Sequence, residues 1–256
     1  MRVAVEAAEA AGVVLRRHFA HGVTAEYKGK GDLVTVADRE AEDVVRARIR
    51  AAFAGDAVVG EEGEPLAEAA VRGRRRWYVD PLDGTTNFVK GQPRWAVGVA
   101  FCGADDRMAA AAVHVPMTGE TFAATLGGGA TLAGIPIHVP DLEVDAALAL
   151  FGPLTGITAA IRVIAPRVLS VRVTGSTVVD LVDLACGRGD LYLGTRQGRW
   201  DLAAGVLIAS EAGAVATDLI GTPLTGPADE VFAATPHVHA ALLAPLREAT
   251  ADRSRR

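Results

Sequence analysis

The chain has 256 residues, half of them apolar and only 5% aromatic, so its core is expected to consist mainly of Ala, Val and Leu. A net charge of −5 argues against nucleic acid as a partner. The apolar run at 146–161 is too short to cross a membrane, and no spanning segment is predicted. Glu6 and Glu9 interrupt the N-terminal apolar stretch, which excludes a signal peptide. We therefore expect a cytoplasmic protein with Cys102 and Cys186 as reduced thiols.

The first part of the chain combines two helices with a set of strands. Apolar residues at helical spacing predict the helices, and short β-rich runs between turn residues predict the strands. The helices are expected at 3–19 and 38–53. The strands are expected at 57–60, 77–79, 96–101 and 108–115, with further short strands within 119–140. Two polar stretches, 27–32 and 72–76, are interpreted as loops, the second as a solvated basic turn.

After Pro166 the pattern changes to an alternation of strands and helices. The predicted helices of the second part are 155–164, 177–186, 201–212 and 236–247. The predicted strands are 169–173, 190–193, 215–217 and 231–233. This organisation predicts one compact catalytic unit over 1–256 with two lobes, an α+β lobe at about 1–150 and an α/β lobe at about 151–252. The tail 253–256 is expected to be disordered.

The sequence DPLDGTTN, which starts at Asp80, carries the clearest chemical signal. Asp80 and Asp83 lie three residues apart directly after a strand, and Pro81 is expected to prevent that strand from simply continuing. The resulting turn can bring both carboxylates and the Leu82 carbonyl to one point, and such hard oxygen ligands suit Mg²⁺. The alternative is a turn in which Asp83 only caps a helix.

Four other acids stand at the ends of predicted elements. Glu61 and Glu62 follow a buried strand, and adjacent carboxylates there need a cation or a proton. Asp38 and Asp201 each open a helix, where an acid often serves only as an N-terminal cap. Each of these signals alone is therefore more typical of a cap or a surface turn than of a metal site. The candidate phosphate donors are the backbone amides of Gly84 and Thr85.

Taken together, these motifs resemble the inositol monophosphatase family of Mg²⁺-dependent, lithium-sensitive phosphatases. The matching segments run in the family's order over most of the chain. They are DLVTVAD at 32–38, GEEG at 60–63, WYVDPLDGTTNFVKGQP at 77–93, GST at 175–177 and WDLAAGVLIASEAGAVATD at 200–218. The resemblance implies a layered α-β-α-β-α sandwich and usually a homodimer.

The resemblance also implies a role for individual residues. It assigns two or three Mg²⁺ ions to Glu61, Asp80, the Leu82 carbonyl, Asp83 and Asp201. It assigns catalysis to Thr85, which would position the attacking water, together with Asp38 and Glu62. It assigns substrate binding to Asp83, Gly84, Thr85, Gly175, Ser176, Thr177 and position 194.

The identity of the substrate alcohol stays open at this point. Many family members carry a glutamate seven residues before the WD aspartate, where it contacts inositol hydroxyls, and this chain has Gly194 there. Inositol monophosphate is the simplest substrate, and histidinol phosphate, a sugar phosphate or a 3′-phosphonucleotide are alternatives. A different class of function, a binding partner of the transcription machinery, is implied by some bacterial relatives. The intact set of metal-binding acids argues for an enzyme.

Overall fold

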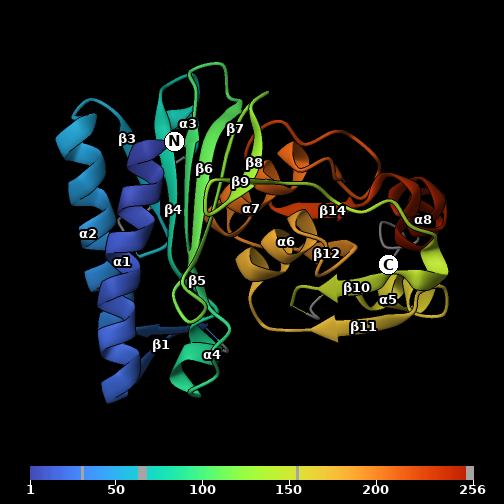
Figure 1. Cartoon of the computed structure of the whole chain (residues 1–256), viewed down its shortest axis with the longest axis horizontal. Helices are drawn as coiled ribbons and strands as arrows, with labels where there is room; N and C mark the ends of the chain where they lie inside the picture. Colours follow the sequence, from blue (N-terminus) through green and yellow to red (C-terminus); the bar gives the residue numbers. More distant parts are fainter. Residues whose placement is uncertain (30–31, 63–67, 154–155, 252–256) are drawn as a thin grey trace.

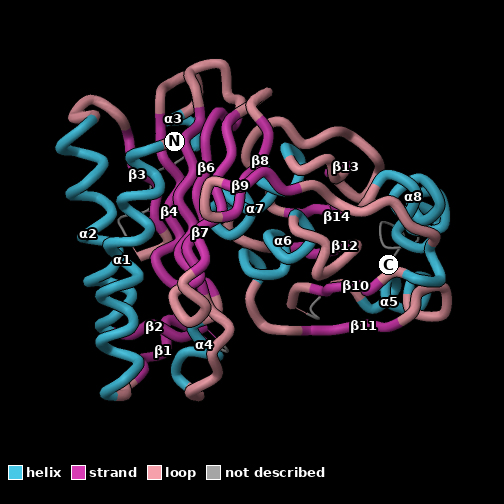
Figure 2. The backbone as a smooth tube through the Cα atoms, viewed as in Figure 1, coloured by secondary structure: helices cyan, strands magenta, loops and turns pink. Residues whose placement is uncertain are grey.

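The computed structural model describes residues 1–29, 32–62, 68–153 and 156–251, and it shows helices and sheets in alternating layers (Figures 1 and 2). The outer layer is α1 (Arg2–His21) with α2 (Val36–Ala52), followed by a seven-stranded sheet. The central layer is α6 (Thr177–Ala185) with α7 (Arg199–Glu211), followed by a five-stranded sheet. The last layer is α5 (Thr158–Ile164) with α8 (Pro236–Ala251). The predicted α-β-α-β-α sandwich is confirmed.

The seven-stranded sheet has its strands in chain order, β3 to β9. Their bounds are Ala57–Gly60, Arg76–Asp83, Ala96–Cys102, Met108–Val115, Glu120–Thr125, Gly129–Leu132 and Ile135–Ile137. β3 pairs with β4 in parallel, and the other neighbours are antiparallel. Helices cover both faces, which explains why all eight residues of β4 are buried.

The five-stranded sheet has the order β11-β10-β12-β14-β13. In that order, the bounds are Ser170–Val173, Leu148–Phe151, Leu191–Thr195, Glu230–Ala234 and Val215–Thr217. β10 is parallel to both of its neighbours, and β14 is antiparallel to β12 and β13. Sequence reasoning missed β10, because it lies inside the apolar run 146–161, where a buried strand has no distinguishing period.

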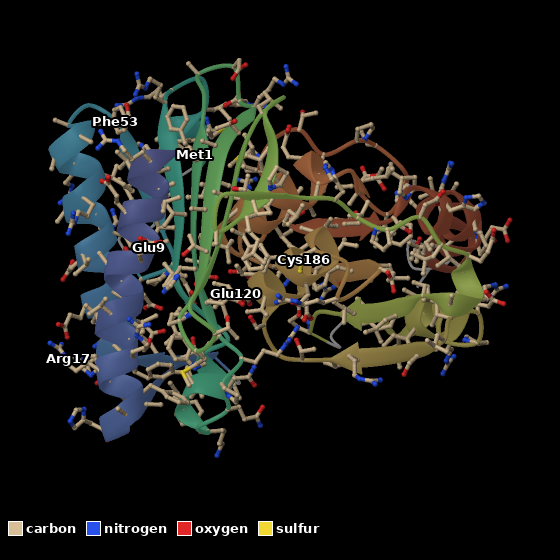
Figure 3. The ribbon with its side chains drawn as sticks, viewed as in Figure 1. Met1, Glu9, Arg17, Phe53, Glu120 and Cys186 are labelled. Atoms are coloured by element: carbon tan, nitrogen blue, oxygen red, sulfur yellow. The ribbon has the colours of Figure 1, made fainter. Side chains whose placement is uncertain are left out.

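Alanine-rich packing holds α1 and α2 against the first sheet. α1 buries Ala4, Ala7, Ala8, Ala11 and Leu15, and α2 buries Ala37, Ala41, Val45 and Ile49. These small side chains let the two helices approach closely, and both join one core with Trp77 of β4 and with Trp95, the residue before β5. Glu9 and Arg17 lie in this outer layer, whereas Cys186 lies in the central one (Figure 3). Cys102 and Cys186 are free thiols, the first buried and the second partly exposed.

Three expectations about the first half need correction. The stretch 27–32 is not simply a loop, because β1 (Ala25–Gly29) and β2 (Asp32–Thr35) pair there as an antiparallel hairpin. The solvated basic turn is wrong at its last residue: Arg76 is buried in β4, where it donates to Asp106 at 2.7 Å. The strand expected to end at Asp80-Pro81 runs on to Asp83 in β4, although its register shifts between Asp80 and Asp83.

The remaining elements are short. α3 is Glu68–Val71, α4 is Thr85–Val89, and Val144–Ala146 forms a single 3₁₀ turn. The helix predicted at 155–164 begins at Thr158 in the structure. Position 155, where the prediction began the helix, lies outside the described ranges, as does the tail 253–256. Among the helices of the described residues, none is both long and apolar enough to cross a bilayer. The division into two lobes stays a prediction.

Candidate metal and phosphate site

Three acids from three elements meet between the first sheet and the central helices. Glu61 follows β3, Asp80 lies in β4 and Asp201 lies in the first turn of α7. One carboxylate oxygen from each of the three residues lies within 4.8 Å of those of the other two. The parallel pairing of β3 with β4 places Gly60 opposite Val79, so the next residues, Glu61 and Asp80, share one edge. The sequence-predicted metal ligands Glu61, Asp80 and Asp201 are therefore brought together.

The electrostatics of this acid cluster favour a bound cation. Burial raises the pKa of Asp80 well above its usual range, and the charges of Glu61, Asp83 and Asp201 raise it further. Burial likewise raises the pKa of Asp201, with added repulsion from Asp83 and Glu61. Carboxylates this close stay ionised at neutral pH only when positive charge joins them. Hard oxygen donors of this kind fit Mg²⁺, so the residues present are able to hold a metal.

Asp83 lies close enough to repel this cluster, yet its oxygens face α6. Oδ2 accepts hydrogen bonds from the Ser176 hydroxyl and, at 3.1 Å, from the Val178 amide; Oδ1 accepts from the Thr177 amide at 3.1 Å. Burial raises the pKa of Asp83 to about 6, against the lowering effect of these hydrogen bonds. The capping alternative is thus present, although the capped helix is α6 and not the helix that follows Asp83. Metal binding by Asp83 stays a prediction.

Thr85 and Asp38 form one hydrogen-bonded unit at the start of α2. The Thr85 hydroxyl lies 3.2 Å from Asp38 Oδ1 and 3.0 Å from the Leu82 carbonyl oxygen. Asp38 Oδ2 accepts from the Thr35 amide at 2.9 Å and from the Thr35 hydroxyl at 2.6 Å. Thr35 therefore fixes Asp38 through a capping box. Sequence reasoning paired Asp38 with Thr85 but missed Thr35, for which the spacing of three residues was an available signal.

Gly84 allows the turn after Asp83 to pack tightly against the loop before α6. Its φ is +87°, and a Cβ there would lie 2.9 Å from the Arg94 carbonyl oxygen. Asn87 joins this turn to two neighbouring segments, because its Nδ2 donates to the carbonyls of Arg94 at 2.8 Å and Thr174 at 2.9 Å. The predicted phosphate turn thus lies beside the predicted substrate segment 175–177. Asn87 was not singled out from the sequence.

A buried ion pair beneath β3 supports the Glu61-Glu62 turn. Glu42 accepts from the Glu62 amide at 2.8 Å and from Arg46 Nε at 2.6 Å. A Cβ at Gly60 would lie 2.5 Å from the Glu42 carboxylate, so glycine makes room for this contact. Sequence reasoning missed Glu42, because an acid four residues before an arginine on a helix looks like an ordinary surface pair.

The position of Gly194 is not an open space. Gly194 is buried in β12, and a Cβ there would overlap the Gln197 side chain and lie 2.7 Å from the Tyr192 hydroxyl. Gln197, which is 8% exposed, fills the volume beside Gly194. Arg196 is exposed and has a φ of +58°, in the left-handed region. A carboxylate at position 194 would therefore need Gln197 to move.

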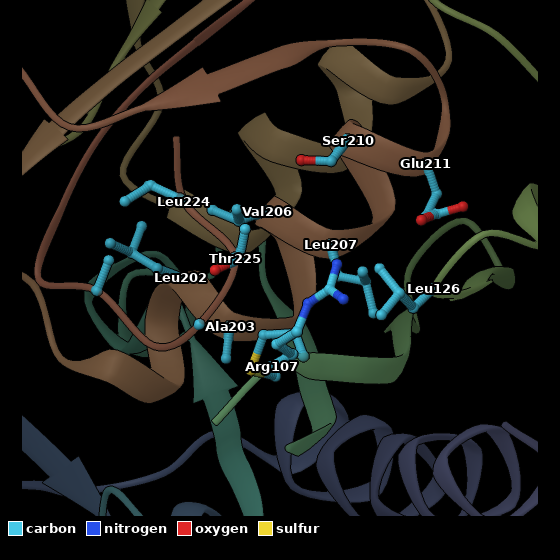
Figure 4. Close-up of a pocket in the computed structure, with 13 residues that line it drawn as sticks. Arg107, Leu126, Leu202, Ala203, Val206, Leu207, Ser210, Glu211, Leu224 and Thr225 are labelled. Atoms are coloured by element: carbon cyan, nitrogen blue, oxygen red, sulfur yellow. The ribbon is translucent and has the colours of Figure 1, made fainter. Parts of the chain in front are cut away.

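A separate apolar hollow of about 200 Å³ lies along α7 (Figure 4). Leu202, Val206 and Leu207 line it from the helix, and Leu126 and Leu224 face them. Its lining is mainly apolar, but Arg107, Ser210 and Glu211 also belong to it. The residues of the acid cluster, Glu61, Asp80 and Asp201, do not line this hollow.

Comparison with known proteins agrees with this architecture. Residues 1–251 match the inositol monophosphatase family, and the chain belongs to this family of phosphomonoesterases. It is 34% identical to the Nus factor SuhB of Vibrio cholerae over 97% of this chain and 96% of the relative. It is also 34% identical to inositol monophosphatase 2 of Solanum lycopersicum, over 96% and 97% of the two chains. The crystal structure of the extragenic suppressor protein suhB from Bartonella henselae matches with a TM-score of 0.89 and 30% identity, over 97% and 98% of the two chains.

Proposed function

We propose that this protein hydrolyses a small phosphate monoester in a Mg²⁺-dependent reaction, most simply inositol monophosphate to inositol and phosphate. The observation that carries the proposal is the cluster of Glu61, Asp80 and Asp201, of which Asp80 is buried and the other two are partly buried. Asp83 and the Leu82 carbonyl complete the proposed ligand set for two or three ions. When bound, Mg²⁺ supplies Lewis acidity, a more acidic water and neutralisation of the phosphate charge.

The remaining groups of the site have chemistry that suits this reaction. The Thr85 hydroxyl directs its single hydrogen toward Asp38 and the Leu82 carbonyl, so its oxygen lone pairs can accept a hydrogen bond from the attacking water. Asp38 is held by Thr35 and keeps that hydroxyl oriented. The amides of Gly84 and Thr85 are the proposed donors to the phosphate, and Glu62 is proposed to act beside Glu61.

The proposed substrate range is broad. Gly194 offers no carboxylate to the hydroxyls of an alcohol, and the volume beside it belongs to the neutral Gln197 amide. A hydrogen bond to a charged group contributes about 1.5–3 kcal/mol, which would otherwise favour a polyol ring. Histidinol phosphate, sugar phosphates and 3′-phosphonucleotides therefore stay in the proposed set. A panel of these esters, compared by kcat/KM, measures the range.

Phosphate release with and without Mg²⁺ tests the proposal directly. Wild-type protein should turn over inositol monophosphate in MgCl₂ and lose this activity in excess EDTA. Asp80→Asn should be inactive in both conditions, because it removes one ligand charge while keeping its shape. Asp145→Asn, at an exposed acid of the 3₁₀ turn, is the matched control and should behave as wild type. Full turnover in EDTA would contradict the proposal.

A second candidate function rests on the relatives that carry the name Nus factor SuhB. We propose binding to the transcription machinery as this alternative, and a homodimer as the assembly in either case. Purified RNA polymerase immobilised on a surface would test the alternative. Binding that persists in Asp80→Asn, combined with a lack of phosphatase activity in the wild type, would favour it. Light scattering would measure the assembly.

A further inference from the structure

Three buried side chains form a closed ring of hydrogen bonds between β12 and the central helices. Gln197 Nε2 donates to the Thr177 hydroxyl, and the Tyr192 hydroxyl donates to Gln197 Oε1 at 3.1 Å. The Thr177 and Tyr192 hydroxyl oxygens lie 2.9 Å apart. Because Tyr192 uses its hydrogen on Gln197, Thr177 must donate to Tyr192, and the ring closes in one direction. Each hydroxyl then has one donor and one acceptor partner.

The ring joins the two helix starts that hold Asp83 and Asp201. The Thr177 amide donates to Asp83 Oδ1 at 3.1 Å. The amide of Gly198, which directly follows Gln197, donates to Asp201 Oδ2 at 2.9 Å. Gln197 therefore connects the start of α6 with the turn before α7. The Asp83 and Asp201 carboxylates repel each other when both are ionised. After burial, the charge of Asp83 is the next largest cause that raises the pKa of Asp201.

The ring fits because glycine stands at two neighbouring positions where a side chain would overlap it. A Cβ at Gly194 would overlap Gln197, and a Cβ at Gly152 would overlap the Tyr192 hydroxyl and lie 3.3 Å from the Gly194 Cα. Gly194 on β12 thus leaves room for the Gln197 side chain, and Gly152, just after β10, leaves room for the Tyr192 hydroxyl. Burial raises the pKa of Tyr192, so its hydroxyl stays protonated and able to donate. The ring is therefore a packed and fully hydrogen-bonded part of the molecule.

We propose that Gln197 is a positioning residue, which holds Asp83 and Asp201 in fixed relation against their mutual repulsion and so raises the affinity of the site for Mg²⁺. It acts through Thr177 and Gly198 and does not itself contact the metal. Groups that orient metal ligands in this indirect way typically contribute about 10- to 100-fold to metal affinity. The inference rests on the proposed function for the role of the metal.

Titration of the full-length protein with MgCl₂, without substrate, tests this role by calorimetry and by the shift of the melting temperature. Gln197→Met keeps the length of the side chain and removes its hydrogen bonds, and we expect about 10-fold weaker Mg²⁺ binding. Tyr192→Phe keeps the ring volume and removes one hydroxyl, and we expect a smaller loss in the same direction. It also serves as the second variant if Gln197→Met does not fold. In turnover assays the Mg²⁺ requirement should rise, while kcat at saturating Mg²⁺ and KM for the ester change little.

Thr217→Val is the matched control for a general loss of stability. Thr217 is a buried hydroxyl in the second sheet that bonds His239 Nε2 at 3.0 Å and the Asp218 carbonyl at 2.8 Å. Its substitution should lower the melting temperature without changing Mg²⁺ affinity. An equal loss of Mg²⁺ affinity in Thr217→Val would overturn the inference, as would unchanged affinity in Gln197→Met and Tyr192→Phe.

The two proposals fail in different ways. If wild-type protein binds Mg²⁺ and hydrolyses none of the esters, while Gln197→Met binds Mg²⁺ more weakly, the proposed function fails and the positioning role stands. If wild-type protein hydrolyses esters and Gln197→Met keeps the wild-type Mg²⁺ affinity, only the positioning role fails. Absence of any Mg²⁺ binding by the wild type would overturn both.

Discussion

Two clusters of acids lie in this molecule, and they differ in what balances their charge. The site cluster consists of Glu61, Asp80 and Asp201. The second cluster is on α6, where one Arg94 nitrogen lies 2.6 Å from Asp180 and 2.7 Å from Asp183. In the second cluster the chain itself supplies the cation. In the site cluster the negative charges of the neighbouring acids repel one another.

The effect on protonation shows what this difference means. Burial raises the pKa of Asp180 to about 6, and Arg94 opposes this rise. Burial raises the pKa of Asp80 as well, but there the surrounding charges of Glu61, Asp83 and Asp201 add to the rise. Equal burial of the same residue type thus accompanies a structural ion-pair network in one place and a candidate cation site in the other. The neighbouring charges distinguish the two, and burial alone does not.

The largest expected effect is the loss of activity in Asp201→Asn. Asparagine keeps the cap at the start of α7, because its side-chain oxygen still accepts from the Gly198 amide. Loss of one ligand charge should lower kcat/KM by at least about 100-fold, or about 3 kcal/mol of transition-state stabilisation. The melting temperature in EDTA should not fall, since one repelling charge is removed. Near-normal kcat/KM would show that Asp201 is only a cap.

The next effect concerns the α6 cluster, where Arg94→Leu should destabilise the fold. Removal of the arginine leaves Asp180 and Asp183 close together without their shared partner. Because the Arg94 side chain is 33% exposed, water screens part of this loss, and we expect about 1–3 kcal/mol in chemical denaturation. Mg²⁺ affinity should stay unchanged. Arg162→Leu, at an exposed position, is the control, and an equal loss there would contradict the comparison.

A smaller effect is expected in the pH dependence of the metal-free protein. The pKa values of Asp80 and Asp201 are raised in the folded state, so the folded protein binds more protons than the unfolded chain. Its stability in EDTA should therefore increase as the pH falls from about 8 toward about 5. Saturating Mg²⁺ should remove this trend. Thermal melts of wild type and Asp80→Asn measure it, and the variant should show the weaker pH dependence of the two.

The smallest effect is expected at Arg196, an exposed cation in the turn before α7. Its φ of +58° is unfavourable for a residue with a Cβ, so Arg196→Gly should stabilise the protein by about 0.5–1 kcal/mol. Activity toward esters with a second anionic group should fall only a few-fold. A large loss of Mg²⁺-dependent activity would show that this arginine also belongs to the balance of charge at the site.

The sequence could predict the layers and the acids because both depend on local patterns. Apolar residues at helical spacing identified α1 and α2, and the DPLDGTTN and WD motifs identified Asp80 and Asp201. The hairpin of β1 and β2 could not be found in this way, because its strands are short and neither has a sustained alternation of apolar and polar residues. β10 was hidden for the opposite reason, since its run is uniformly apolar.

The supporting residues of the site were the least predictable. Glu42 holds the Glu62 amide from 20 residues away, and Gln197 bonds Thr177 from 20 residues away. Neither residue belongs to a motif that names its partner, and each contact exists only after two elements have packed. The tight glycine positions at 60 and 194 were visible in the sequence, but their meaning depends on which side chain fills the space beside them.

The capping of α6 by Asp83 has a consequence for the order of folding. The Ser176 hydroxyl reaches Asp83 across 93 residues of chain, and Asp201 comes still later. During synthesis, the first sheet can therefore emerge with Glu61, Asp80 and Asp83 already assembled as a repelling group. The amides at the start of α6 stabilise Asp83 only after that segment leaves the ribosome, and Asp201 completes the acid cluster later still. Acquisition of Mg²⁺ affinity would thus mark the completion of the fold, and stalled chains ending before residue 176 should not show it.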